Sequence, residues 1–165
     1  MFISCNFDTM KYRILTSEEL EVFAEDFKHF LIVNGVHNEE WVEMNQSAVE
    51  KAKQFVELFS DTVLQKVYEK LKFVEHRSEK SCMVFKLNEE HVELISVNAK
   101  EGSDVNLSTP ESIHEALVNS PDQLTFFKSQ KPYTNSREEE IHKMLEQGCV
   151  HSSEAFWISL EKVVA

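Results

Sequence analysis

Two glutamate and histidine pairs have a spacing that could bind metal. Glu111 and His114 are three residues apart, and so are Glu139 and His142. On a helix this spacing puts both side chains on one face, as in bundle proteins that hold two metal ions between carboxylates and imidazoles. Such a site needs two further carboxylates that point inward, and the charged neighbours of both pairs indicate exposed helix faces. The pairs give one hypothesis, a small metal-dependent or histidine-assisted enzyme.

A thiol and an imidazole also stand close together, at Cys149 and His151. A nucleophile needs a base that a third group orients, and neighbouring side chains on an irregular segment seldom meet that geometry. A buried cysteine after the helix-ending Gly148 is the simpler interpretation. The sequence has no Gly-rich phosphate loop, no Gly-x-Ser-x-Gly and no His-Glu-x-x-His. It therefore predicts no catalytic residue and no cofactor, and favours a binding protein over an enzyme.

Basic residues gather in two stretches of a chain whose formal net charge is −12. Bases outnumber acids over residues 66–86, and residues 128–137 contain bases but no acid, whereas residues 87–125 are strongly acidic. Side chains from the two basic stretches could together bind a phosphate or carboxylate beside a stacking ring. The candidates are His76, Arg77, Lys80, Lys131, Tyr133 and Arg137. Two ordinary solvated loops would give the same pattern.

The elements that would position these side chains centre on residues 72–98. Residues 82–87 and 91–97 are rich in strand-favouring types, and only three polar residues separate them, which predicts an antiparallel hairpin. A third candidate strand, residues 73–76, precedes them. We therefore predict an α+β fold with a small three-stranded antiparallel meander over about residues 72–98. Three strands alone are marginal, so helices must pack on an apolar face.

Apolar residues repeat at helical spacing on both sides of this sheet. A capping box, Thr16 with Glu19, begins the first helix. The predicted helices span about residues 17–34, 39–45 and 48–71 before the sheet and 110–119, 137–147 and 153–163 after it. We expect the first and third helices to pair antiparallel against the sheet. Residues 122–129 are expected to hold one or two helical turns, and residues 130–135 to be extended because of Pro132.

Length and composition indicate one domain. With 165 residues, the chain can bury a real core, and we predict a flexible extension over residues 1–10 followed by a single domain over residues 11–165. The three widely spaced cysteines suggest no disulfide framework, so a reducing cytoplasm fits best. No run approaches the roughly 18 apolar residues of a membrane span, and the start lacks the features of a signal peptide.

Three segments carry a resemblance to a known family. They are KYRILTSEEL from Lys11, EHRSEKS from Glu75 and REEEIHKMLEQG from Arg137. In these segments the chain resembles a family of small acidic proteins from Bacteroidetes-type bacteria, known as a domain of unknown function. The resemblance implies a bacterial cytoplasmic protein. It transfers no catalytic residue to this chain.

These observations favour a non-enzymatic binding module that acts in a cytoplasmic macromolecular complex, through the basic residues near Arg77 and Arg137. The expected partner is a protein or a ribonucleoprotein. Free DNA is not expected to bind, because phosphate backbones require a basic surface. The alternatives are the metal-dependent enzyme described above and a structural, self-associating module. The sequence does not predict the oligomeric state.

Overall fold

A computed structural model describes residues 10–164, and it divides the chain into two compact units, one ending at Val67 and the other beginning at Tyr68. Of the extension predicted over residues 1–10, all but Met10 lies outside the described residues. The single domain expected over residues 11–165 stays a prediction.

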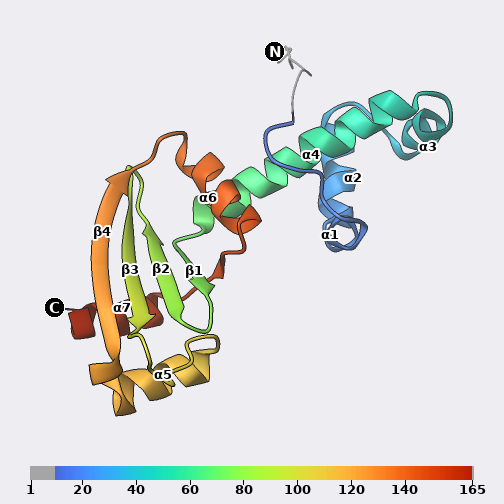
Figure 1. Cartoon of the computed structure of the whole chain (residues 1–165). Coiled ribbons are helices and arrows are strands. Elements are labelled where there is room, and N and C mark those ends of the chain that lie inside the picture. Colours follow the sequence, from blue (N-terminus) through green and yellow to red (C-terminus); the bar gives the residue numbers. More distant parts are fainter. Residues whose placement is uncertain (1–9, 165) are drawn as a thin grey trace. The chain divides into compact units, whose positions relative to one another are not determined.

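The first unit is helical. Its elements are α1 (Ser17–Val22), α2 (Ala24–Val33), α3 (Asn38–Ser47) and α4 (Val49–Lys70), whose last residues belong to the second unit (Figure 1). The capping box is confirmed, because the Thr16 hydroxyl accepts the Glu19 amide and the Glu19 carboxylate accepts the Thr16 amide. The continuous helix predicted over residues 17–34 is wrong. It is interrupted at Phe23, and the apolar spacing carries across this residue, so periodicity alone does not reveal the break.

Aromatic rings form the core of this unit. The Phe59 ring of α4 lies 4.9 Å from Phe27 and 5.4 Å from Phe30, centre to centre. Trp41 of α3 meets Phe27 edge to face at 5.2 Å. The aromatic residues of α2 thus pack against α3 and α4, a geometry that stabilises beyond simple burial.

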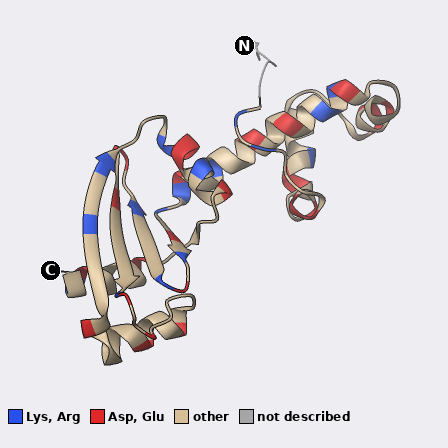
Figure 2. Ribbon diagram, in the orientation of Figure 1, with Lys and Arg blue, Asp and Glu red and all other residues tan. Residues whose placement is uncertain are grey.

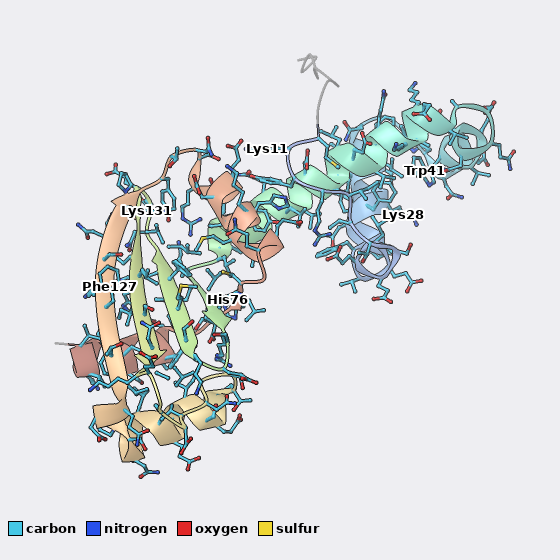
Figure 3. The ribbon with its side chains drawn as sticks, in the orientation of Figure 1. Lys11, Lys28, Trp41, His76, Phe127 and Lys131 are labelled. Atoms are coloured by element: carbon cyan, nitrogen blue, oxygen red, sulfur yellow. The ribbon has the colours of Figure 1, made fainter. Side chains whose placement is uncertain are left out.

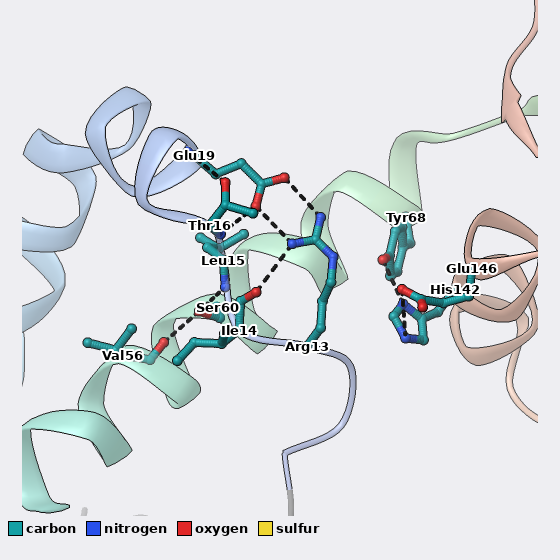
Figure 4. A network of polar contacts seen from close by, with 10 residues as sticks. All are labelled: Arg13, Ile14, Leu15, Thr16, Glu19, Val56, Ser60, Tyr68, His142 and Glu146. Carbon is teal, nitrogen blue, oxygen red and sulfur yellow. Dashed lines mark hydrogen bonds and ion pairs between the residues drawn. The ribbon is translucent and has the colours of Figure 1, made fainter. Parts of the chain in front are cut away.

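The segment before α1 is held on α4 by hydrogen bonds from its main-chain amides to side chains of that helix. The Asp61 carboxylate accepts from the amides of Lys11, at 2.6 Å, and Tyr12, at 2.9 Å. The Leu15 amide donates to Ser60 Oγ at 3.0 Å, and the Ser60 hydroxyl donates in turn to a carbonyl of α4 (Figure 4). The Leu15 bond satisfies a buried backbone amide that would otherwise cost free energy.

The second unit contains one sheet of five strands. They are β1 (Phe73–Arg77), β2 (Ser81–Leu87), β3 (His91–Ala99), β4 (Leu124–Pro132) and β5 (Val150–His151). Their order is β4-β3-β2-β1-β5, and every neighbouring pair is antiparallel. The three predicted strands are present, but the three-stranded meander is wrong. The helical turns expected over residues 122–129 are also wrong, because a short 3-10 turn at Pro121–Gln123 leads directly into β4.

Sequence patterning misses β4 because the strand lies at the edge of the sheet. Only Leu124 is buried along it, so β4 lacks the apolar alternation of a half-buried strand. What makes it a strand is pairing with β3 at every position from Ala99–Leu124 to His91–Pro132. The two-residue β5 is too short to be recognised by any pattern.

The two faces of the sheet differ. Strand residues on the core face, such as Val84 and Ile95, pack with α5 (Pro110–Asn119) and α7 (Glu154–Val164) into the main hydrophobic core. Residues on the other face, here called the α6 face, include His76 and Phe85, and α6 (Arg137–Glu146) lies on that side. Figure 1 shows α7 crossing the sheet and α5 at one end of the strands.

None of the helices in the described part of the chain combines the length and the apolar composition that membrane crossing demands.

Candidate functional site

A cavity of about 390 Å³ lies between α6 and the α6 face of the sheet. Its floor is apolar and comes from three strands, with Met83 and Phe85 of β2, Val92 of β3 and Pro132 at the end of β4. Pockets of this size, with apolar walls and a few polar groups, are typical of small-ligand or side-chain binding sites. The cavity is therefore the candidate site.

One stripe of α6 forms the opposite wall. Glu140, Lys143, Met144 and Gln147 line the cavity at intervals of three and four residues, which puts them on one side of the helix. The neighbouring Ile141 is completely buried and holds the helix to the rest of the unit. This wall is not predicted from the sequence, because a stripe of mixed charged and apolar residues gives no amphipathic signal.

Arg137 positions the start of α6. Its guanidinium donates to four main-chain carbonyls, those of Tyr68 (2.8 Å), Leu71, Leu87 (3.2 Å) and Asn88 (3.1 Å). Two of these carbonyls lie at the end of α4, and two lie at the turn from β2 to β3. Only 9% of the side chain is exposed. Arg137 is therefore a structural clamp rather than a ligand-binding group.

The end of α6 is held from two sides. The His142 ring meets the Tyr68 hydroxyl at 2.9 Å, between Nδ1 and Oη, and has Glu146 at 4.0 Å (Figure 4). Gly148, whose φ of +101° favours glycine, ends the helix and lies against the His76 ring. A Cβ at this position would sit 3.5 Å from His76 Nε2.

The cavity carries more positive than negative groups. Lys131 and Lys143 line it and are exposed, and within the described residues neither makes an ion pair. Its carboxylate, Glu140, accepts the Asn135 amide at 3.2 Å. His76 contributes a ring whose buried Nδ1 has no hydrogen-bond partner in the described part of the chain. In a chain of net charge −12, this is a local positive site.

The thiol and the phenol in the cavity lining are held in their protonated forms. Burial raises the pKa of the Cys149 thiol above its usual range, which disfavours the reactive thiolate. Burial also raises the pKa of Tyr133, whose hydroxyl donates to the Asn88 carbonyl at 2.8 Å. The arrangement is suited to holding a ligand by charge and apolar contact.

Of the six residues that the sequence predicted to form a basic site, three line the cavity: His76, Lys131 and Tyr133. Figure 3 labels the first two on β1 and at the end of β4. Arg77 lies on the core face, ion-paired with Glu75 and 5.9 Å from the Phe156 ring. Lys80 donates to the carbonyls of Ser103, at 2.9 Å, and Val105, at 3.3 Å.

The two glutamate and histidine pairs are not brought together. Glu111 and His114 lie on α5, which packs on the core face, and both are exposed. Glu139 and His142 lie on α6, on the opposite side of the sheet. Among residues 10–164, no three histidine, cysteine or acidic side chains are grouped so that they could hold a metal ion.

The first unit has a hollow of its own, of about 750 Å³, between α2 and α3. Phe27, Leu31 and Trp41 are among its lining residues. None of the residues predicted from the sequence to bind a ligand or a metal lies there. The cavity beside α6, by contrast, is lined by three of the predicted residues, His76, Lys131 and Tyr133.

Comparison with known proteins identifies a family but no characterised relative. Residues 10–165 match the model described as "Family of unknown function (DUF6495)". No curated protein and no solved structure matches the chain.

Proposed function

The chain belongs to this family of unknown function, and we propose that it is a non-enzymatic binding module. In this proposal its cavity binds an acidic segment of a partner protein. The observation that carries the proposal is the pair of lysines, Lys131 and Lys143, that face an apolar cavity without an ion pair in the described part of the chain. A cation beside a partly desolvated apolar floor gains most from a ligand that brings its own negative charge.

The shape of the site defines the occupant further. Met83, Phe85 and Met144 offer flexible and aromatic surface to one apolar side chain. The lysines at the wall suit a carboxylate next to it. A segment with an apolar residue flanked by aspartate or glutamate satisfies both requirements. It brings few negative charges to a chain of net charge −12, whereas RNA brings one phosphate per nucleotide, so a protein partner is favoured over RNA.

The cellular setting of this proposal is a macromolecular complex in the cytoplasm of a bacterium. The resemblance of residues 11–20, 75–81 and 137–148 to proteins of Bacteroidetes-type bacteria supports this setting. So does the absence of any cysteine pattern typical of disulfide-stabilised secreted domains.

The test is site-specific photocrosslinking in the source cells. The photoreactive residue p-benzoylphenylalanine replaces Phe85 on the cavity floor, and crosslinked products are identified by mass spectrometry. We expect a discrete protein adduct that disappears when Lys143→Glu is added, since the substitution puts a like charge beside the acidic segment. With a fluorescent peptide from the crosslinked region, Lys143→Glu should weaken binding about tenfold or more, which corresponds to about 1.4 kcal/mol.

Lys162→Glu is the matched control, because Lys162 is an exposed lysine in the last turn of α7 and does not line the cavity. It changes the net charge equally and should leave the adduct intact. An adduct that survives Lys143→Glu, or one lost equally with both variants, would refute the cavity as the binding site. An adduct removed by ribonuclease would assign the site to RNA instead.

A further inference from the structure

The strand β4 is a long, open edge of the sheet. It is an end strand in the order β4-β3-β2-β1-β5, and most of its nine residues are exposed. Phe127, midway along it (Figure 3), is 57% exposed, and its pairing with Ser96 of β3 puts it on the α6 face. Edge strands present unpaired backbone groups that can bind another strand, and an exposed aromatic ring beside them increases that tendency.

The ladder with β3 determines which backbone groups of β4 are free. The Lys100 amide donates to the Gln123 carbonyl at 2.8 Å. These two residues continue the ladder after the pair Ala99–Leu124, and they are hydrogen-bonded to each other. In an antiparallel ladder, bonded and non-bonded pairs alternate, so residues 125, 127, 129 and 131 bond toward β3. The amides of Phe126, Lys128 and Gln130 therefore point away from the sheet. Pro132 continues the same row but has no N–H, so it ends the row of free donors.

We propose that β4 pairs antiparallel with β4 of a second copy of this chain, about a two-fold axis at Phe127. In this register Phe126 and Lys128 of each copy exchange hydrogen bonds with Lys128 and Phe126 of the other. Phe127 faces its own counterpart as a non-bonded pair, in which side chains come closest. The two sheets become one continuous sheet of ten strands, with an isologous interface.

Neighbouring symmetric registers are less favourable. An axis at Lys128 would put the two Lys128 side chains directly opposite each other, and like charges in that position destabilise. An axis at Phe126 would centre the contact on a ring that already packs against the core of its own copy, and Phe127 would face Thr125. The axis at Phe127 alone pairs the two exposed aromatic rings.

Charge complementarity favours a second copy as the partner of this strand. Each β4 carries Lys131 near one end. Asp122 and the acidic residues of the stretch 101–115 lie by the other end (Figure 2). Antiparallel pairing brings Lys131 of one copy opposite Gln123 of the other and next to its Asp122. The basic end of each copy thus meets the acidic end of its partner. The inference does not rest on the proposed function, although both involve Lys131, because Thr125, Phe127 and Ser129 carry the register and do not line the cavity.

The test is register-specific disulfide formation in the full chain. All variants carry Cys5→Ser, and the remaining Cys82 and Cys149 are buried. Phe127→Cys is expected to form a disulfide-linked dimer under mild oxidation, because directly opposed, non-bonded residues have Cβ atoms roughly 4.5–5.5 Å apart. Thr125→Cys and Ser129→Cys should each stay monomeric alone but crosslink when mixed, since the register pairs residue 125 with residue 129 of the other copy.

Unmodified protein provides the second measurement. Light scattering should give twice the monomer mass at high concentration, and Phe127→Asp should give the monomer mass with an unchanged circular dichroism spectrum. A monomer at every concentration, or equal crosslinking of Thr125→Cys, Phe127→Cys and Ser129→Cys alone, would overturn the proposal. So would photocrosslinking from position 127, in cells, to a different protein in place of a second copy.

Discussion

Arg137 shows how a residue that the sequence marks as a ligand-binding group can serve the fold instead. Its charge and its place in a basic stretch predicted a role in binding. In the structure all four of its acceptors are main-chain carbonyls that lie up to 69 residues away in sequence. Carbonyl acceptors leave no pattern in a sequence, so no sequence argument could have found this role.

Replacing Arg137 should destabilise the protein more than it affects the charge of the cavity. Arg137→Gln removes the four hydrogen bonds that the mostly buried guanidinium donates to main-chain carbonyls, and we expect the free energy of unfolding to fall by about 3 kcal/mol. Urea denaturation followed by circular dichroism measures the loss. Arg137→Lys keeps the charge but not the fork of donors, so it should recover only part of the stability.

Lys131→Gln is the control for this measurement, since the side chain is exposed and has no ion pair in the described residues. Its unfolding free energy should stay within about 0.5 kcal/mol of the original. Equal destabilisation by Arg137→Gln and Lys131→Gln would contradict the structural role of Arg137.

The start of α1 contains a carboxyl group that links stability to pH. The Arg13 guanidinium donates to both oxygens of Glu19, at 2.8 and 2.9 Å, and the Thr16 amide donates as well (Figure 4). These contacts lower the pKa of Glu19 from 4.5 to about 2, with the Arg13 hydrogen bonds as the largest cause. The charged form is therefore favoured in the folded state.

A lowered folded-state pKa stabilises the protein above the unfolded-state value, and the stabilisation is lost as the pH falls from about 4.5 to about 2. Because 36% of the Glu19 side chain is exposed, we expect a contribution of at most about 1 kcal/mol. Denaturation of the original protein and of Glu19→Gln across this pH range tests it. The difference between them should shrink toward low pH, and a constant difference would refute the assignment.

At the scale of elements, prediction succeeded where burial imposes a pattern. The long helix and the three central strands bury alternating or periodic apolar residues, so α4, β1, β2 and β3 lie close to their predicted positions. The break at Phe23 leaves the apolar spacing unchanged, and the strand β4 follows from its pairing with β3, so neither has a pattern of its own in the sequence. His76 and Lys131 are predicted from the basic stretches and Tyr133 as a stacking ring beside them, whereas Lys143 and Met144 are recognisable only from the position of α6 over the sheet.

The alternation of backbone groups along β4 has a direct consequence for proline substitution. Ser129→Pro removes an N–H that bonds to β3 and should lower the unfolding free energy by about 2 kcal/mol or more. Gln130→Pro removes an N–H that points to the free edge, so its cost should be under about 1 kcal/mol. Both are measured by urea denaturation at low protein concentration. A larger cost for Gln130→Pro would contradict the register.

At the scale of the whole molecule, the two units each contain one tryptophan. Trp41 packs against Phe27 in the first unit, and Trp157, 1% exposed, lies in the core of the second. The chain has two tryptophans in all, so Trp41→Phe and Trp157→Phe each leave a fluorophore in one unit. The unfolding of either unit can thus be followed separately.

The single domain expected from the sequence predicts that the two units unfold together. Helix α4 crosses from one unit into the other as a continuous helix, and helix formation is cooperative along its length. With each variant, the urea midpoint from its remaining tryptophan should coincide with the midpoint from circular dichroism. If fluorescence and circular dichroism give different midpoints in either variant, the chain forms two independently folding domains.

The direction of the β4 amides also determines how quickly each exchanges its hydrogen for deuterium. Those of residues 125, 127, 129 and 131 bond to β3 and open only when the sheet does, whereas those of Phe126, Lys128 and Gln130 face solvent in a single copy. Exchange rates along this strand should alternate between slow and fast from one residue to the next. A partner strand from any chain would accept hydrogen bonds from these three amides and slow their exchange together. Slow exchange at all three would therefore show that the edge is paired.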